Sequence, residues 1–200
     1  MGYSIGMERE EPQMTNTLQN VGLGLLATLA TVAGGGAQAG YVYDGVHLMD
    51  GSDFVGNEVL AGDMINSLTE MGIPVVDGGK NDLPVCQPDE AKGSYTLGYY
   101  VPADNYMVIC TNVAPVALQF ETLTHEAVHV IQDARTGIQN DDLIGPGQKT
   151  HEKLVDGLAD KKIDTIVSLY DKEDWVIETE AFFFEDKPEA VAGALQSWAF

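Results

Sequence analysis

Apolar residues recur along much of the chain at the spacing of helices that bury one face. The first such segment covers about residues 57–71, and the Gly-Ser-Asp stretch at 51–53 offers a cap before it. Its apolar positions are Leu60, Met64, Leu68 and Met71. A second segment, at about 115–135, is followed by Gly137, and a glycine just past the last helical residue commonly ends a helix. Helices are therefore expected at about 57–71, 115–135, 151–170, 174–186 and, beyond Pro188, up to Trp198.

Two runs of β-forming residues lie between the first two helices. Residues 95–101 and 106–110 are joined by Pro-Ala-Asp-Asn, which has turn chemistry, so they predict a hairpin. Shorter strands are expected at residues 41–43 and 73–76, the latter limited by Pro74. Helix, hairpin and further helices indicate an α+β domain in which a small sheet packs on the helix at 115–135.

The N-terminal segment differs from the rest of the chain. An apolar run at 21–33 is shorter than the about 20 residues that span a bilayer, and Ala37-Gln38-Ala39 follows it. This is the layout of a secretory signal peptide, although Arg9 is the one basic residue before the run. The alternatives are a flexible Ala/Gly-rich leader and a core helix. We therefore expect a signal peptide or flexible leader at 1–39 and one domain at 40–200.

Charge narrows the range of partners. The 200 residues include 31 acidic and 10 basic side chains, a formal net charge of −21. Binding to phosphate backbones requires a cationic face, so nucleic acid and anionic membrane are excluded as expected partners. No segment outside the leader is long and apolar enough for a membrane anchor. A secreted or periplasmic protein is expected if the signal peptide is real, and a cytoplasmic one otherwise.

Two cysteines, Cys86 and Cys110, are present. In an exported protein they predict one disulfide, which stabilises the fold by roughly 3 kcal/mol in the loop-entropy description. In a reducing compartment they would instead be two buried thiols.

The residues that indicate chemistry form the pentapeptide His125-Glu126-Ala127-Val128-His129. On a helix, positions i and i+4 share a face, so the two imidazoles can bind one Zn²⁺ at about 2.0–2.1 Å. Glu126 then lies where it can take a proton from a zinc-bound water without coordinating the metal. The apolar stripe of this helix lies on nearly the opposite side and consists of Leu123, Ala127, Val130 and Ala134. A solvated polar face is the alternative interpretation of the histidines.

A catalytic zinc needs a third protein ligand. The metzincin arrangement would require Gly at position 132 and His at position 135, and this chain has Gln132 and Arg135. A ligand from a later helix remains, and the segment 174–186 contains Glu178 and Glu180 among apolar residues. A buried acid needs a partner, and a metal ion is one such partner.

At these residues the chain resembles the gluzincin group of zinc peptidases, the thermolysin-like and related families. The matching residues are the His-Glu-x-x-His pentapeptide and Glu178-Thr179-Glu180-Ala181. The resemblance implies a zincin-like fold and Glu178 as the third ligand. Glu180 is the second choice, because its neighbours along the helix are even more apolar than those of Glu178. The Asp that often follows the Ala, and that supports a ligand His, is Phe182 here.

Other residues are weaker candidates. The strand at 106–110, with Tyr106 and Val108, is a candidate for pairing with an extended substrate, or an ordinary buried strand. Tyr170 and Tyr106 can stabilise a tetrahedral intermediate, or simply pack. His151 can be a third ligand or an oxyanion donor, or an exposed residue at a helix start.

These observations predict a zinc-dependent metallopeptidase that acts on a peptide or protein substrate through a zinc-bound water activated by Glu126. Two alternatives keep the zinc. One is a binding module that the metal stabilises without turnover. The other is an amidase that acts on a non-protein amide such as a cell-wall cross-link.

Overall fold

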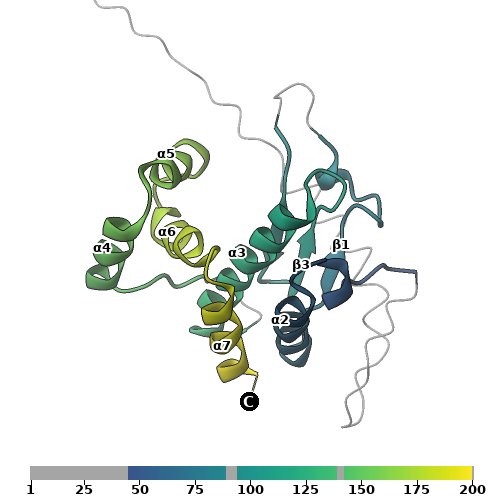
Figure 1. The fold of residues 1–200 in the computed structure, drawn as a ribbon. Coiled ribbons are helices and arrows are strands. Elements are labelled where there is room, and N and C mark those ends of the chain that lie inside the picture. Colours follow the sequence, from purple (N-terminus) through teal and green to yellow (C-terminus); the bar gives the residue numbers. More distant parts are fainter. Residues whose placement is uncertain (1–44, 89–93, 139–141, 200) are drawn as a thin grey trace, which may run out of the picture. The chain divides into compact units, whose positions relative to one another are not determined.

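The computed structural model describes residues 45–88, 94–138 and 142–199, in which six α-helices and a three-stranded sheet give an α+β architecture (Figure 1). The helices are α2 (Glu58–Glu70), α3 (Val116–Ala134), α4 (Gln148–Gly157), α5 (Asp160–Leu169), α6 (Trp175–Phe184) and α7 (Pro188–Trp198). The strands are β1 (Val75–Asp77), β2 (Gly98–Val101) and β3 (Tyr106–Ile109), and two short 3-10 turns are η1 (Gly51–Asp53) and η2 (Pro84–Cys86). The α+β prediction is confirmed. The expected leader at 1–39 and strand at 41–43 lie outside the described residues.

The predicted hairpin is present, and its second strand is central in the sheet. The strand order is β1-β3-β2, with β1 parallel and β2 antiparallel to β3. The far side of β1 is covered by residues 47–49, through an antiparallel bridge from Leu48 to Val76. Among the described residues no further strand pairs with β2, so β2 is the free edge. The interpretation of residues 106–110 as a substrate-pairing strand is wrong, because β3 already has a partner on each side.

Alternation along β3 divides the core in two. Met107 and Ile109 belong to the large core that α2, α3 and α7 complete. Tyr106, Val108 and Cys110 face the other side of the sheet and form a smaller core with Cys86. Successive side chains of a strand point to opposite faces, so this division follows directly from the strand assignment.

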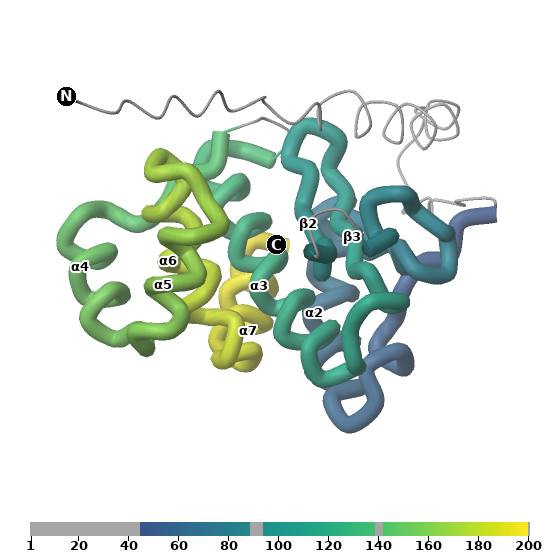
Figure 2. Tube along the Cα trace, turned by 90° about the horizontal axis from the view of Figure 1, so that it is seen from above, coloured from purple at the N-terminus to yellow at the C-terminus, as the bar shows by residue number. Residues whose placement is uncertain are grey.

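Helix α3 is the central helix, with the sheet and α2 on one side and α6 on the other (Figures 1 and 2). Its predicted apolar stripe is buried, with Leu123, Ala127 and Val130 fully covered. The helix approaches β2 closely at Gly98, where a Cβ atom would lie 2.6 Å from the Thr122 methyl group. A glycine is therefore required at the point where the edge strand crosses the helix.

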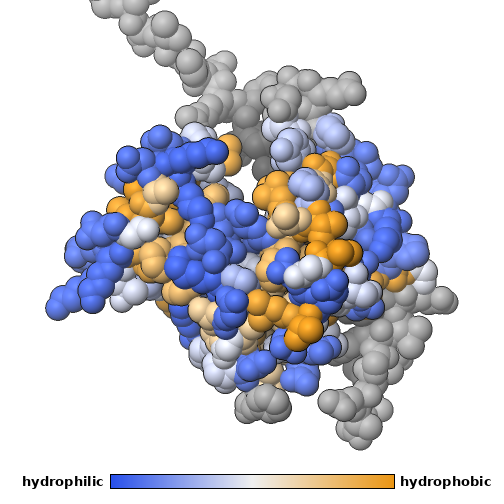
Figure 3. Space-filling model, in the orientation of Figure 1, coloured by the Kyte–Doolittle hydropathy of each residue, from blue (hydrophilic) through white to orange (hydrophobic). Residues whose placement is uncertain are grey.

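The single helix expected at 151–170 is wrong, because two helices, α4 and α5, occupy this region. Helix α4 ends at Gly157, where a Cβ atom would lie 2.7 Å from the Phe183 ring of α6. Leu158 and Ala159 then adopt extended backbone before α5 begins. The side chains over α4 and α5 are largely hydrophilic in the view of Figure 3, which fits helices that contact the rest mainly through α6. Among the described residues no helix has both the length and the apolar content needed to cross a bilayer.

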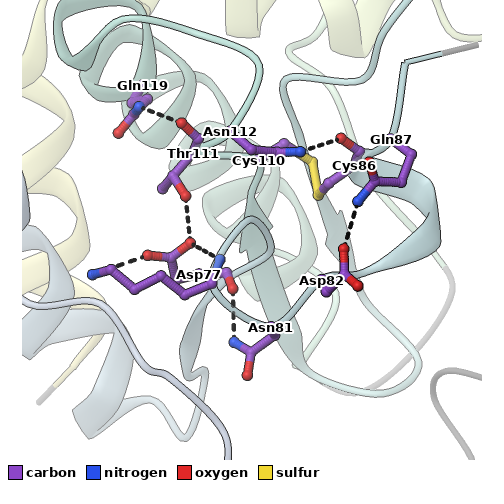
Figure 4. The surroundings of a disulfide bond; sticks show 10 residues. Asp77, Asn81, Asp82, Cys86, Gln87, Cys110, Thr111, Asn112 and Gln119 are labelled. Carbon is purple, nitrogen blue, oxygen red and sulfur yellow. Dashed lines mark hydrogen bonds and ion pairs between the residues drawn. A yellow bond between two sulfur atoms is a disulfide. The ribbon is translucent and has the colours of Figure 1, made fainter.

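The predicted disulfide is present and joins η2 to the end of β3 (Figure 4). The Asn112 side chain donates to the Cys86 carbonyl at 2.9 Å. Nearby, the Thr111 hydroxyl donates to Asp77, a buried carboxylate that also pairs with Lys80. These contacts fix the segment after β3 from which α3 begins.

A buried hydrogen bond attaches the hairpin to α3. The Tyr100 hydroxyl of β2 donates to the Asp133 carboxylate at 2.7 Å, and Asp133 is fully buried. The Asn105 side chain in the hairpin turn donates to the Gly72 carbonyl after α2 at 3.2 Å. Polar groups buried in this way hold elements in one arrangement, because breaking the contact leaves a desolvated group behind.

We expect Tyr100→Phe to lower the free energy of unfolding by about 1–3 kcal/mol, because it deprives a buried carboxylate of a donor. Tyr99→Phe is the matched control on the same strand, since the Tyr99 side chain packs against the smaller core on the other face of the sheet. Urea unfolding followed by circular dichroism measures both variants. Equal losses in the two would contradict the assigned role of the Tyr100 hydroxyl.

Candidate metal site

Three side chains from two helices converge at the interface of α3 and α6. The ligand atoms of His125, His129 and Glu178 all lie within 4.8 Å of one another. The Nε2 atoms of His125 and His129 are 3.4 Å and 3.5 Å from the two Glu178 oxygens. All three residues are buried, so the alternative of a solvated polar face is wrong.

This donor set fits a metal ion. Two imidazole nitrogens and one carboxylate oxygen are a set that zinc takes in catalytic sites, where one further position stays open. The Oε2 atom of Glu178 is buried, and its contact with His125 Nε2, at 3.4 Å, is longer than a well-formed hydrogen bond. A buried carboxylate whose contacts are this long can take a closer partner, and a cation between the histidines would be that partner. His125, His129 and Glu178 can therefore hold a metal ion.

The outer nitrogen of His125 contacts a residue that the sequence analysis did not identify. Glu185, just after α6, places Oε2 2.9 Å from His125 Nδ1, and its other oxygen is 2.9 Å from Lys162 Nζ. A carboxylate there orients the ring with Nε2 toward the site. Glu185 thus stands in for the acid missing at Phe182, whose ring packs edge-on against His125. The sequence feature that could have identified Glu185 is its position seven residues after Glu178, because residues two helical turns apart lie on the same face.

Charge around His125 favours a cation. Burial lowers the pKa of His125, but the hydrogen bonds to Glu178 and Glu185 outweigh it and raise the pKa to about 10. Without a metal, this imidazole therefore carries a proton at neutral pH between two carboxylates. A metal ion that binds here replaces that proton, because a ligand nitrogen must be deprotonated.

Glu180, the second choice for the third ligand, belongs to a different contact. Its carboxylate is held by Arg135 through two hydrogen bonds of 2.8 Å and 2.7 Å. It also accepts a hydrogen bond from Gln132, whose oxygen lies 2.8 Å from His129 Nδ1. Gln132 and Arg135, which stand where the metzincin arrangement would have Gly and His, thus both belong to the contacts behind His129.

The predicted base, Glu126, lies buried beside the histidines. Burial raises its pKa and the charge of Glu178 adds to this, while the histidines and the backbone N–H of Tyr100 act in the opposite direction. A carboxyl group with a raised pKa is a stronger proton acceptor than an ordinary carboxylate. The contact with Tyr100 also places Glu126 against the free edge of the sheet.

Among the weaker candidates, Tyr170 lies at this site. Burial raises the pKa of its hydroxyl, and the negative charges of Glu178 and Glu126 raise it further, so the phenol stays protonated and can donate a hydrogen bond. Its ring packs edge-on against Phe182. Tyr106 and Val108 do not line the site, because both face the sheet side away from α3. His151, on α4, is not part of the converging group.

Fold and site together define an α+β domain with a buried His-His-Glu group that can bind a metal ion. Residues 80–200 match the family described as a domain of unknown function (DUF8637). Because the match covers more than half of the chain, the protein belongs to this family. No curated protein and no solved structure matches the chain.

We expect His129→Ala and Glu178→Ala to abolish stoichiometric zinc binding, because each removes one of three ligands. His151→Ala should bind zinc like the wild type and is the matched control. Metal analysis of the dialysed proteins measures the difference. Unchanged zinc content in Glu178→Ala would show that α6 supplies no ligand to the metal site.

We also expect Glu185→Gln to weaken zinc binding by about 10- to 100-fold, the usual effect of losing a partner of a ligand histidine. The neighbouring Asp186→Asn is the control, because Asp186 is exposed and pairs with lysines rather than with His125. Competition with a chelator of known affinity measures both. Equal losses of zinc affinity in the two variants would indicate that removing a negative charge causes the effect, and not the contact with His125.

Proposed function

We propose that the protein is a zinc-dependent metallopeptidase of gluzincin type. The observation that carries the proposal is the convergence of His125, His129 and Glu178 with Glu126 beside them. When bound in such a site, a zinc ion supplies a Lewis acid that polarises a carbonyl and makes water more acidic. Three protein ligands leave a position open, which favours catalysis over a purely structural metal.

Glu126 is the proposed general base and acid. It takes a proton from the attacking water and then gives it to the leaving amine of the cleaved peptide. Two features of the chain support this role. The burial of Glu126 raises its pKa, and the Tyr100 N–H binds the Glu126 carboxylate, which therefore stays beside the ligands without joining them.

The edge strand β2 is the proposed binding surface for an extended peptide. Met107 donates its N–H to Pro74, and Ile109 accepts from Gly78, so both point their backbone groups toward β1. Their partners across the hairpin, Tyr100 and Gly98, therefore turn their own backbone groups outward. The Tyr100 N–H binds Glu126, so a peptide would pair with the Tyr100 carbonyl and with the backbone groups of Gly98. A peptide that pairs with this edge would lie alongside Glu126, and recognition through backbone groups tolerates varied side chains.

Tyr170 is the proposed donor to the developing oxyanion. Its hydroxyl stays protonated because of burial and the surrounding carboxylates. A positioned donor in a buried site stabilises negative charge more than it would in water.

Glu126→Gln tests the proposal. We expect the variant to retain its zinc and to lose about 10²- to 10⁴-fold in turnover of a quenched fluorescent peptide library, because the amide cannot take up a proton. Zinc content and cleavage rate are measured on the same preparation. Wild type and variant that are equally inactive on peptides, with zinc bound in both, would contradict the peptidase proposal.

A further inference from the structure

A chain of buried polar contacts leads away from the second ligand histidine. His129 Nδ1 is 2.8 Å from Gln132 Oε1, and Gln132 Nε2 donates to the Ile177 carbonyl at 2.9 Å and to Glu180 at 3.0 Å. Gln132 is fully buried between α3 and α6. Every polar group of this side chain therefore has a partner within the protein.

These partners determine which way the Gln132 amide points. The Ile177 carbonyl and the Glu180 carboxylate can only accept hydrogen bonds, so both must face the NH₂ group. The amide oxygen then faces His129, and it can only accept. His129 Nδ1 must therefore carry the proton, which leaves the lone pair of Nε2 directed toward Glu178 and the metal position.

Arg135 completes the chain at its outer end. Its guanidinium binds both oxygens of Glu180, at 2.8 Å and 2.7 Å, and donates to the Ile144 carbonyl at 2.8 Å. A planar fork of donors fixes a carboxylate in position and orientation, which a single ammonium cannot do. The Arg135 side chain is 30% exposed, while Glu180 is buried. The cation thus compensates a buried negative charge that would otherwise be free to turn toward other partners.

We propose that Arg135 is a positioning residue of the metal site, acting on His129 through Glu180 and Gln132. The inference rests on the proposed metal site but not on peptide cleavage. Arg135 holds the Glu180 carboxylate, the carboxylate holds the Gln132 amide, and the amide holds the His129 ring with its Nε2 lone pair toward the metal. Removing the guanidinium frees Glu180 to rotate, and the Gln132 amide then keeps only one of the two acceptors that set its orientation, the Ile177 carbonyl.

The test measures metal binding in the full chain. Zinc affinity is obtained by chelator competition, and the visible spectrum of the cobalt(II) form reports the geometry of the ligands. We expect Arg135→Met to weaken zinc binding by about 10-fold, the lower end of the effect of outer partners, and to change the cobalt spectrum. Lys187→Met is the matched control, because it removes the same charge from a surface side chain that contacts Asp186 and Phe183 instead.

A double-mutant cycle separates the relay from a general structural effect. If Arg135 acts through Gln132, adding Arg135→Met to Gln132→Leu should cause little further loss of zinc affinity. Additive losses, or an Arg135→Met protein with the zinc affinity and cobalt spectrum of Lys187→Met, would overturn the inference. If Gln132→Leu does not fold, the comparison of Arg135→Met with Lys187→Met decides alone.

The outcomes also separate this inference from the proposed function. Wild-type protein that binds no zinc would overturn both. Wild-type protein that binds zinc and cleaves no peptide would overturn the peptidase proposal, while a weakened Arg135→Met would still support the positioning role. If the wild type cleaves peptide and Arg135→Met keeps the full zinc affinity, the peptidase proposal stands and the positioning role is overturned.

Discussion

The packing of α6 against α3 depends on partners for four buried carboxylates. Glu126, Glu178, Glu180 and Glu185 are each less than 9% exposed, and an isolated buried charge is too costly to persist. Glu180 pairs with Arg135, and Glu185 pairs with Lys162 and His125. Glu178 and Glu126 have the two histidines, the Tyr170 hydroxyl and the Tyr100 backbone N–H near them. The two carboxylates at the ligand site thus depend on the histidines, or on a cation bound between them, for compensation of their charge.

The two ligand histidines are supported in parallel ways. His125 contacts Glu185, which pairs with Lys162. His129 contacts Gln132, which is followed by Glu180 and then by Arg135. Each chain ends in a cation that is partly exposed, so that the charge of the inner acid is compensated at the surface. The first chain places an acid directly on the ring, whereas the second places a neutral amide there. This difference makes His125 the more strongly polarised of the two imidazoles.

The sheet side of α3 is held by a separate set of contacts. Tyr100 connects β2 to Asp133 on α3, and the disulfide holds the end of β3 on the opposite face of the sheet. Gly98 lets the edge strand come close to the helix. Together these contacts keep the outward backbone groups of β2 beside Glu126.

The sequence by itself determined the local elements and the chemistry of α3. Helical spacing placed His125 and His129 on one face, the hairpin followed from its turn residues, and the disulfide followed from two cysteines. Tertiary structure decided the rest. It placed Glu178 at the histidines and Glu180 on Arg135, supplied Glu185 in place of the acid missing at Phe182, divided the helix expected at 151–170 at Gly157, and buried β3 in the middle of the sheet. The physical reason is that spacing along a helix or strand defines its faces, whereas the partner that each face meets depends on contacts between residues far apart in the chain.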